Sequence, residues 1–421
     1  MAEDWTVDFL TVSRHAEPPA EAIVTRALAG AGFGSADYAA ATPPAGAPPM
    51  GRRRIGVYTL TEPNGHATGR IVLARHDGPV LADMGKTTFE LLTRGLGADD
   101  VTTLREGQLA MDLRVQVVNA SNGAYLAWAT RVLLVLLGLT EGAGIDPAAQ
   151  RCYGRVELAQ LASAASPAAH VNIHAEPWQQ DGIWLHTHGL QKFARPELEL
   201  LDVPRAFEAE GRALLSDLMD MLARGSRLSA GQEVDFDDQG SLMALSVPSD
   251  IDHQAPFGRL RLVDTPAPGE QLGTSVRRYL MRSVLAEALR RAARGDVASA
   301  QEATERILSA DPDDGDALAF KARLRLRAGE PVEALEIGEL MELRRPQDGR
   351  GGVIVGHALA ALGRWREAHR AYTRAIERNP DDGEAYAGRA EAADHLGMAN
   401  DAASDRARST YLRRLATTGG R

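Results

Sequence analysis

Apolar and polar residues alternate in several short segments of the first two thirds of the chain. A period of two is typical of β-strands that bury one face and expose the other. The predicted strands are residues 5–12, 54–60, 69–76, 112–118, 241–248 and 258–264. Asn64-Gly65 lies between the second and third of these strands, and this dipeptide favours a tight turn. The pattern therefore predicts a β-hairpin over residues 54–76.

Helical patterns alternate with these strands. Residues 19–32 carry proline at the start and glycine at the end, and residues 204–225 are amphipathic. The apolar run 124–139 contains Arg131 and is too short to cross a bilayer, so we expect a buried helix that leads into a short strand. The interleaving predicts an α+β domain over residues 1–270, with a mixed or antiparallel sheet and helices on one face. A division of this region into two subdomains stays open.

A repeat of 34 residues marks the last third of the chain: Pro312, Pro346 and Pro380 share this spacing. Glycine and alanine recur in the same frame, at Gly295, Gly329, Gly363 and Gly397 and at Ala300, Ala334, Ala368 and Ala402. The units are residues 281–314, 315–348, 349–382 and 383–416. Each is predicted to be two antiparallel helices, because glycine ends the first helix and proline follows the second. Stacked pairs then bury a continuous core.

This spacing and residue pattern resembles the tetratricopeptide repeat. The resemblance implies an all-α solenoid over residues 275–416, after a turn-rich linker at 264–273 and before a disordered tail at 417–421. The first helices of such units line a concave groove. The groove positions predicted from the repeat frame are Leu285, Leu289, Phe320, Arg323, Arg327, Ile354, His357, Glu391 and His395.

The predicted groove mixes apolar and arginine side chains. Chaperone-binding members of the family hold a carboxylate with lysine and asparagine, and Leu285 and Leu289 occupy the matching places here. We therefore do not expect a chaperone tail as the ligand. An acidic or amphipathic peptide is one candidate partner. The alternative is a solenoid that packs only on its own N-terminal domain.

Composition narrows the classes of function. The 421 residues carry a formal net charge of −10, which argues against a general nucleic-acid binder or a binder of anionic membranes. Cys152 is the one cysteine and excludes an intramolecular disulfide, which fits a cytoplasmic location. A small buried residue is the expected role of Cys152. The first residues lack a basic segment followed by an apolar core, so no secretory signal is expected.

Four of the eleven histidines fall within 19 residues: His170, His174, His186 and His188. Asp181-Gly182 favours a hairpin between the two segments that carry them. Residues two and four apart in a strand share a face, so three or four imidazoles could converge, with Glu176 beside them. Such a set suits zinc. A structural polar network is the interpretation favoured here, and the zinc site, a proton-transfer role and a ligand contact are the alternatives.

Two carboxylates follow the histidines, Glu197 and Glu199, and their spacing places them on one face of a strand. Such a pair could serve as a general acid and base. The more common role is the solvated face of an edge strand, which is the interpretation favoured here.

The segment "WLHTHGLQKFARPELEL" resembles a motif of uncharacterised bacterial α+β domains of the DUF4026 and DUF4261 kind. Ala194 stands where those domains usually have glycine. The resemblance implies a fold type and no activity. It rests on these residues: Thr187, His188, Gly189, Leu190, Phe193, Pro196, Glu197 and Glu199.

Together, these patterns favour a non-enzymatic adaptor or scaffold that binds a partner protein or peptide through the repeat groove. No cofactor is required by this interpretation, and no catalytic residue is assigned. One alternative is an enzyme that uses the histidines as metal ligands or as acid and base groups. Another is an immunity-like or antitoxin-like protein that neutralises a basic partner, since the repeat region is close to neutral and the acidity belongs to the N-terminal domain.

Overall fold

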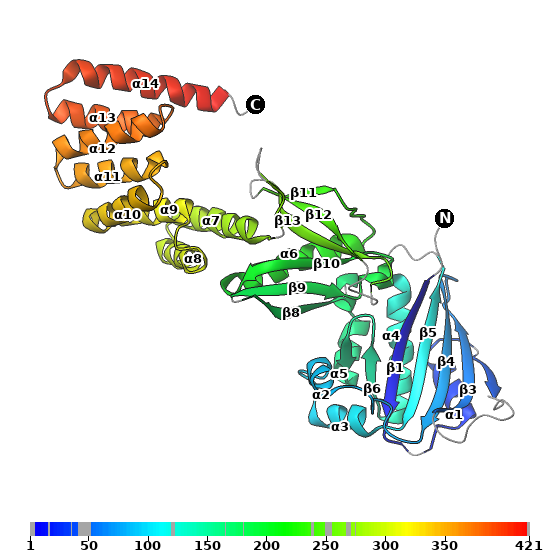
Figure 1. The fold of residues 1–421 in the computed structure, drawn as a ribbon. Helices are drawn as coiled ribbons and strands as arrows, with labels where there is room; N and C mark the ends of the chain where they lie inside the picture. The colour runs from blue at the N-terminus through cyan, green and yellow to red at the C-terminus, as the bar shows by residue number, and fades with distance from the viewer. Residues whose placement is uncertain are drawn as a thin grey trace. The chain divides into compact units, whose positions relative to one another are not determined.

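A computed structural model describes residues 5–15, 17–34, 36–40, 52–118, 123–164, 166–179, 181–236, 240–248, 255–266, 271–273 and 275–418. The chain divides into two compact units, Met1–Arg277 and Arg278–Arg421. The first unit consists of sheets and helices, and the second consists of consecutive helical hairpins (Figure 1). The predicted fold classes of both regions are confirmed. The predicted linker falls partly on residues 267–270, outside the described residues.

The first unit begins with a seven-stranded sheet in the order β2-β3-β4-β5-β1-β6-β7. All neighbouring strands in it are antiparallel. The predicted hairpin is formed by β3 and β4, and Gly65 in its turn has a φ of 75°. The strands are β1 (Trp5–Ser13), β2 (Asp37–Ala40), β3 (Arg52–Thr61), β4 (Ala67–His76), β5 (Leu109–Val117), β6 (Ala143–Asp146) and β7 (Arg151–Tyr153).

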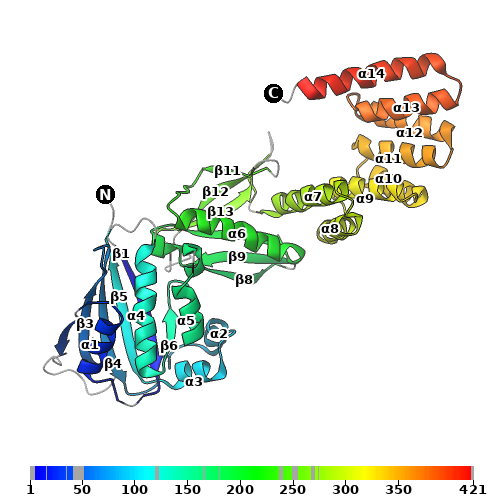
Figure 2. The same cartoon turned by 180° about the vertical axis from the view of Figure 1, so that it is seen from behind.

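Helices pack on both faces of this sheet, where the sequence pattern had predicted helices on one face. The predicted buried helix is α4 (Ala124–Thr140), which packs on β1 and β5, and α1 (Glu21–Gly30) packs against α4 (Figure 2). Trp128 of α4 is fully buried. Three shorter helices are α2 (Lys86–Leu92), α3 (Ala98–Glu106) and α5 (Arg155–Ala162). In the part of the chain that the structure describes, no helix has the length and apolar character needed to cross a membrane.

A second sheet follows in the same unit, where the sequence pattern had predicted a single sheet. Its order is β11-β12-β13-β10-β9-β8, and only the pair β10 and β13 is parallel. Helix α6 (Glu208–Ala223) packs on β9 and β10. The strands are β8 (Asn172–Trp178), β9 (Gly182–His188), β10 (Glu197–Pro204), β11 (Glu233–Asp235), β12 (Ser241–Val247) and β13 (Arg259–Asp264). Short 3-10 helices are η1 (Pro167–His170), η2 (Leu190–Phe193) and η3 (Arg205–Phe207).

The interpretation of Glu197 and Glu199 as an exposed edge was wrong. Strand β10 lies between β9 and β13, and each of the two glutamates is only 2% exposed. The local alternation is the same for an edge strand and an interior strand. Strand β13, about sixty residues later in the chain, pairs with the second edge of β10 and makes it an interior strand.

The second unit contains eight described helices that form four hairpins. Each first helix ends before a glycine with positive φ, at Gly295, Gly329, Gly363 and Gly397, as the repeat pattern predicted. The helices are α7 (Arg277–Ala293), α8 (Val297–Ala310), α9 (Gly315–Arg327), α10 (Pro331–Arg344), α11 (Gly349–Ala361), α12 (Trp365–Arg378), α13 (Gly383–His395) and α14 (Ala399–Thr418).

Aspartates repeat at the starts of the first helices. Asp314, Asp348 and Asp382 each accept a hydrogen bond from a backbone N–H in the first turn, which satisfies a group that the helix itself leaves unpaired. The last three repeats therefore carry their own start and stop signals. The predicted disordered tail begins too early, because α14 continues through Thr418; residues 419–421 lie outside the described residues.

Candidate functional site

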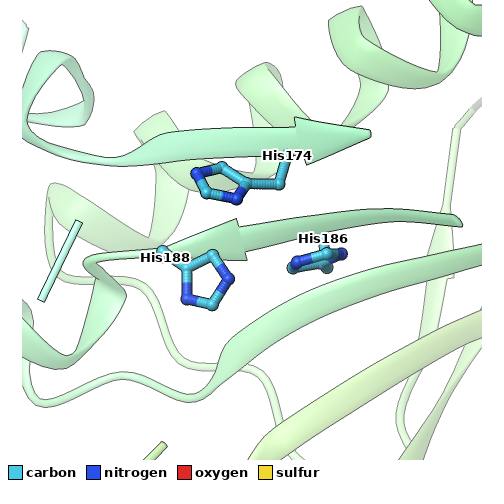
Figure 3. A group of neighbouring side chains, drawn as sticks. All are labelled: His174, His186 and His188. Carbon is cyan, nitrogen blue, oxygen red and sulfur yellow. The ribbon is translucent and has the colours of Figure 1, made fainter. Parts of the chain in front are cut away.

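The β8–β9 hairpin presents three histidines on one face of the second sheet. His174 of β8 is the cross-strand partner of His186 of β9, and Asn172 is the partner of His188. Alternation along β9 adds Trp184 to the face that carries His186 and His188. The three imidazoles lie next to one another, as Figure 3 shows. The predicted hairpin thus gathers three of the four candidate metal ligands.

The three rings are close enough to share a ligand. Their centroids are separated by 5.7 Å for His174 and His186, 4.8 Å for His174 and His188, and 4.9 Å for His186 and His188. One ring nitrogen from each residue lies within 4.8 Å of the other two. Among the described residues, this is the group of three or more histidine, cysteine or carboxylate side chains that could hold a metal ion.

The cluster is largely shielded from water, and burial favours the neutral form of two of its imidazoles. His186 and His188 are 3% and 6% exposed, and His174 is half-buried. Burial, followed by the positive charge of Arg259, lowers the pKa of His186 to about 3. Burial also lowers the pKa of His174. Neutral imidazole is the form that binds metals.

Neighbouring groups hold the rings in place. The Asn172 side-chain amide lies 2.8 Å from His174 Nε2, and a hydrogen bond with the backbone of Gln150 also fixes this ring. The Trp184 ring lies against His186 with a centroid separation of 4.0 Å. Glu176, which was expected beside the histidines, places Oε1 3.8 Å from His186 Nε2.

Glu199 supports the same face from β10. It accepts a hydrogen bond from Trp184 Nε1 at 3.1 Å and forms an ion pair with Arg261, whose Nε lies 2.6 Å from Glu199 Oε1. Both carboxylate oxygens are therefore engaged. The arrangement positions Trp184 against the histidine cluster.

His170 lies apart from the cluster. The strand that the sequence predicted from this residue begins at Asn172, and His170 ends the 3-10 helix η1. Pro167 at the start of η1 favours the turn, which places the imidazole off the strand. The ring is buried, and burial together with the Lys192 charge lowers its pKa to about 3.

The Thr-His-Gly motif builds a turn around a buried carboxylate. Glu197 accepts hydrogen bonds from Thr187 Oγ1 at 2.7 Å, from Gly189 N at 2.8 Å and from Gln191 N at 3.3 Å. Gly189 has a φ of 116°, which explains glycine at this position. Burial raises the pKa of Glu197, and these hydrogen bonds act in the opposite direction.

Other motif residues complete the same turn. Phe193 is buried, Pro196 is half-buried before β10, and Ala194 adopts a left-handed conformation with a φ of 52°. Alanine therefore forms the turn at the place where the resemblance predicts glycine. The candidate structural motif contributes backbone geometry, whereas only His188 of its members belongs to the histidine cluster.

A buried ion pair between Lys192 and Asp146 was missed by the sequence analysis. Both side chains are fully buried, and Lys192 Nζ also donates to the backbone carbonyl of His170 at 2.7 Å. Tyr125 Oη donates to the Lys192 carbonyl at 2.7 Å. The pair joins η2, beside the second sheet, to β6 of the first sheet. The signal was a lysine that directly precedes Phe193 in the stretch "GLQKF".

The first helices of the last three repeats present polar residues on one face. Arg323 of α9 pairs with Glu384 of α13 at 2.8 Å, and His357 of α11 places Nδ1 3.9 Å from Glu384 Oε1. Side chains from three successive first helices thus meet. We refer to Arg323, Arg327, His357, Glu384 and Glu391 as the inner polar face. Glu384 was not among the predicted groove residues, although its place at the start of α13 was readable from the repeat.

Of the remaining residues predicted to line the groove, some are buried and others are exposed. Phe320 and Ile354 are 7% and 3% exposed, so they belong to the core of the repeats and not to a groove surface. Their positions face the partner helices, which bury them. Leu285 is half-buried, and Leu289 is 48% exposed. His395 stacks on Trp365 with a centroid separation of 3.6 Å, and Glu391 is exposed.

Comparison with known families identifies the helical region. Residues 285–348 and 356–415 match the tetratricopeptide repeat. This confirms the resemblance read from the 34-residue spacing, and such repeats commonly bind proteins. No curated protein matches the chain. The resemblance of the Thr-His-Gly segment to uncharacterised bacterial domains stays a prediction.

Solved structures of repeat proteins are similar to part of the chain. The thermophilic TPR protein TTC0263 of Thermus thermophilus is 24% identical, with a TM-score of 0.30; the match covers 31% of this chain and 74% of that protein. MamA is 21% identical, with a TM-score of 0.27 and coverage of 30% and 74%. MamA from Desulfovibrio magneticus RS-1 is 18% identical, with a TM-score of 0.28 and coverage of 32% and 76%.

Proposed function

We propose that the chain is a protein-interaction adaptor whose tetratricopeptide repeats bind an acidic peptide segment of a partner protein. The meeting of Arg323, His357 and Glu384 carries the proposal, because it defines one continuous face on three successive first helices. A face of this kind is long enough to hold an extended peptide.

The charges on this face favour an acidic ligand. Arg327 is one helical turn from Arg323 on α9, and both side chains are exposed. Arginine binds carboxylates through paired N–H donors. An acidic peptide can replace Glu384 as the partner of Arg323. Glu391 on α13 is exposed and would repel acidic residues, so we expect the part of the peptide beside Glu391 to be less acidic.

The N-terminal unit would serve as the second part of the adaptor. The acidity of the whole chain belongs to this region, while the repeats are close to neutral. Cys152 is buried, and burial raises its pKa to about 12, so its thiol is unreactive. A reducing compartment such as the cytoplasm suits a chain with this single cysteine.

The experiment is capture of partners by the full-length protein, with bound proteins identified by mass spectrometry and their acidic segments then measured as synthetic peptides. Charge reversal in Arg323→Glu with Arg327→Glu is expected to abolish peptide binding. The matched control is Arg366→Glu with Arg370→Glu on α12, where both side chains are also exposed. The proposal is overturned if both double variants bind the captured peptides as the wild type does.

A further inference from the structure

We propose that His174, His186 and His188 bind one divalent transition-metal ion of the zinc class through one ring nitrogen each. The site lies in the N-terminal unit, and the adaptor function of the repeats neither supports it nor depends on it. Three observations carry the proposal: the convergence of the rings, a buried ring nitrogen without a partner, and the groups that orient the rings.

The distances between the three ring nitrogens are close to those between the ligand atoms of a bound metal. The ligand atoms are within 4.8 Å of one another. Zinc–nitrogen bonds of about 2.0–2.1 Å in a tetrahedral site place the nitrogens about 3.4 Å apart. The widest separation must therefore shorten by about 1.4 Å, which small rotations about the side-chain bonds of two imidazoles supply. Because all three residues lie on two directly paired strands, the backbone need not move.

His186 offers a nitrogen that nothing else satisfies. Its Nδ1 is buried and has no hydrogen-bond partner among the described residues. Most buried polar atoms in folded proteins have a hydrogen-bond partner. A metal ion bound to Nδ1 would satisfy this atom. A neutral imidazole carries a free lone pair on one of its two nitrogens, and this lone pair can bond to a metal.

The surroundings supply orientation and charge. The backbone of Gln150 holds His174, and Trp184 supports His186; a metal on His174 Nε2 would replace the Asn172 amide that lies 2.8 Å from this nitrogen. Such outer contacts fix ligand rings before a metal binds. Arg259 lies near His186 and opposes a cation, but Glu176 is half-exposed, 3.8 Å from His186 Nε2, and supplies a compensating negative charge.

The ligand set selects the metal. Imidazole nitrogen suits zinc, cobalt, nickel and copper, whereas magnesium and calcium require oxygen ligands. With three protein ligands, a fourth position stays open to water. We therefore expect zinc to bind and magnesium to leave the site empty.

The test uses the full chain purified without an affinity tag, stripped with a chelator and titrated with Zn²⁺, Co²⁺ and Mg²⁺ by calorimetry. The expected result is one equivalent of zinc per chain, a rise in melting temperature on zinc addition, and no binding of magnesium. Co²⁺ should give the visible absorption bands of a four- or five-coordinate site. Zinc below half an equivalent, or cobalt that remains six-coordinate, would overturn the proposal.

Variants locate the ion. His174→Gln and His188→Gln are each expected to weaken zinc binding by at least about 100-fold. Loss of a residue that only orients a metal ligand weakens metal affinity by up to about 100-fold, and loss of the ligand itself should weaken it at least as much. His66→Gln is the control, since His66 is exposed on another hairpin of the same unit. Unchanged affinity in both ligand variants would mean that zinc binds elsewhere. The apo variants are melted first, and if neither is folded, the cobalt spectrum of the wild type decides the outcome.

Discussion

The two units of this chain are stabilised over different distances along the sequence. In the repeats, contacts join neighbouring helices: the Arg344–Asp313 ion pair spans 31 residues, and even the Arg323–Glu384 pair spans only 61. In the N-terminal unit, Ser13 Oγ donates to the carbonyl of Thr140 across 127 residues. A fold held by contacts between residues close in sequence can be predicted from a short motif. Where the contacts join residues far apart in sequence, the motif does not show which polar residues will be buried.

Substitution of Lys192, which pairs with Asp146, tests most directly whether contacts between distant residues stabilise the first unit. Lys192→Met leaves a buried carboxylate without its cation and is expected to lower the free energy of unfolding by about 3–5 kcal/mol. Urea denaturation followed by tryptophan fluorescence measures the loss. Adding Asp146→Leu should restore much of the stability, because a buried pair can be replaced by apolar groups.

Lys86→Met is the matched control for that substitution. Lys86 pairs with Glu90 at 3.8 Å on an exposed helix surface, where such a pair contributes about 0.3–0.5 kcal/mol. A Lys192→Met variant as stable as Lys86→Met would show that distant ion pairs do not hold the first unit together.

In the repeats, the tightest packing is between a tyrosine and two glycines. The Tyr372 ring is 1% exposed and occupies the space where a Cβ at Gly356 or Gly388 would stand. Gly388→Ala is therefore expected to cost about 1–3 kcal/mol through overpacking. Thermal denaturation of the full chain, followed by circular dichroism, measures the loss in the helical transition.

Gly383→Ala serves as the control on the same helix. A Cβ there would meet its nearest atoms at 3.4 and 3.5 Å, close to ordinary contact distances, so a change within about 0.5 kcal/mol is expected. Equal effects at Gly388 and Gly383 would contradict the packing argument.

A buried histidine gives the N-terminal unit a pH dependence. The pKa of His170 is about 3 in the folded protein and about 6.5 when unfolded, so the unfolded chain binds more protons between these values and stability falls as pH falls below about 6.5. One such group lowers the free energy of unfolding by about 2 kcal/mol between about pH 7.5 and 5. Urea denaturation across this range should show a shallower pH dependence for His170→Gln. An identical dependence in the variant would refute the assignment.

The smallest expected effect is a gain in stability at Ala194. Its φ of 52° is costly for alanine and free for glycine, so Ala194→Gly should raise the free energy of unfolding by about 0.5–1 kcal/mol after the entropy of glycine in the unfolded chain is subtracted. Ala159→Gly on the exposed surface of α5 should lower it by about 1 kcal/mol. A loss at both positions would argue against the left-handed turn.

Much of the candidate histidine site was predictable, because a hairpin requires only adjacent strands. The Asp181-Gly182 signal and the alternation of residues place His174, His186 and His188 on one face. His170 was misplaced because a 3-10 turn interrupts the alternation just before β8. The same limit applies to the groove: the repeat frame locates the first helices correctly, but burial of Phe320 and Ile354 depends on the helices stacked against them.

The sequence by itself determined the features that repeat or lie close together: four helical hairpins, their glycine stops, and the strands with their local turns. Only the tertiary structure decided that there are two sheets in the N-terminal unit, that β10 is an interior strand and that Lys192 meets Asp146. The physical reason is that side-chain periodicity reports which face of an element is buried. It does not report which distant element covers that face, and burial of Glu197, Glu199 and Lys192 depends on that choice.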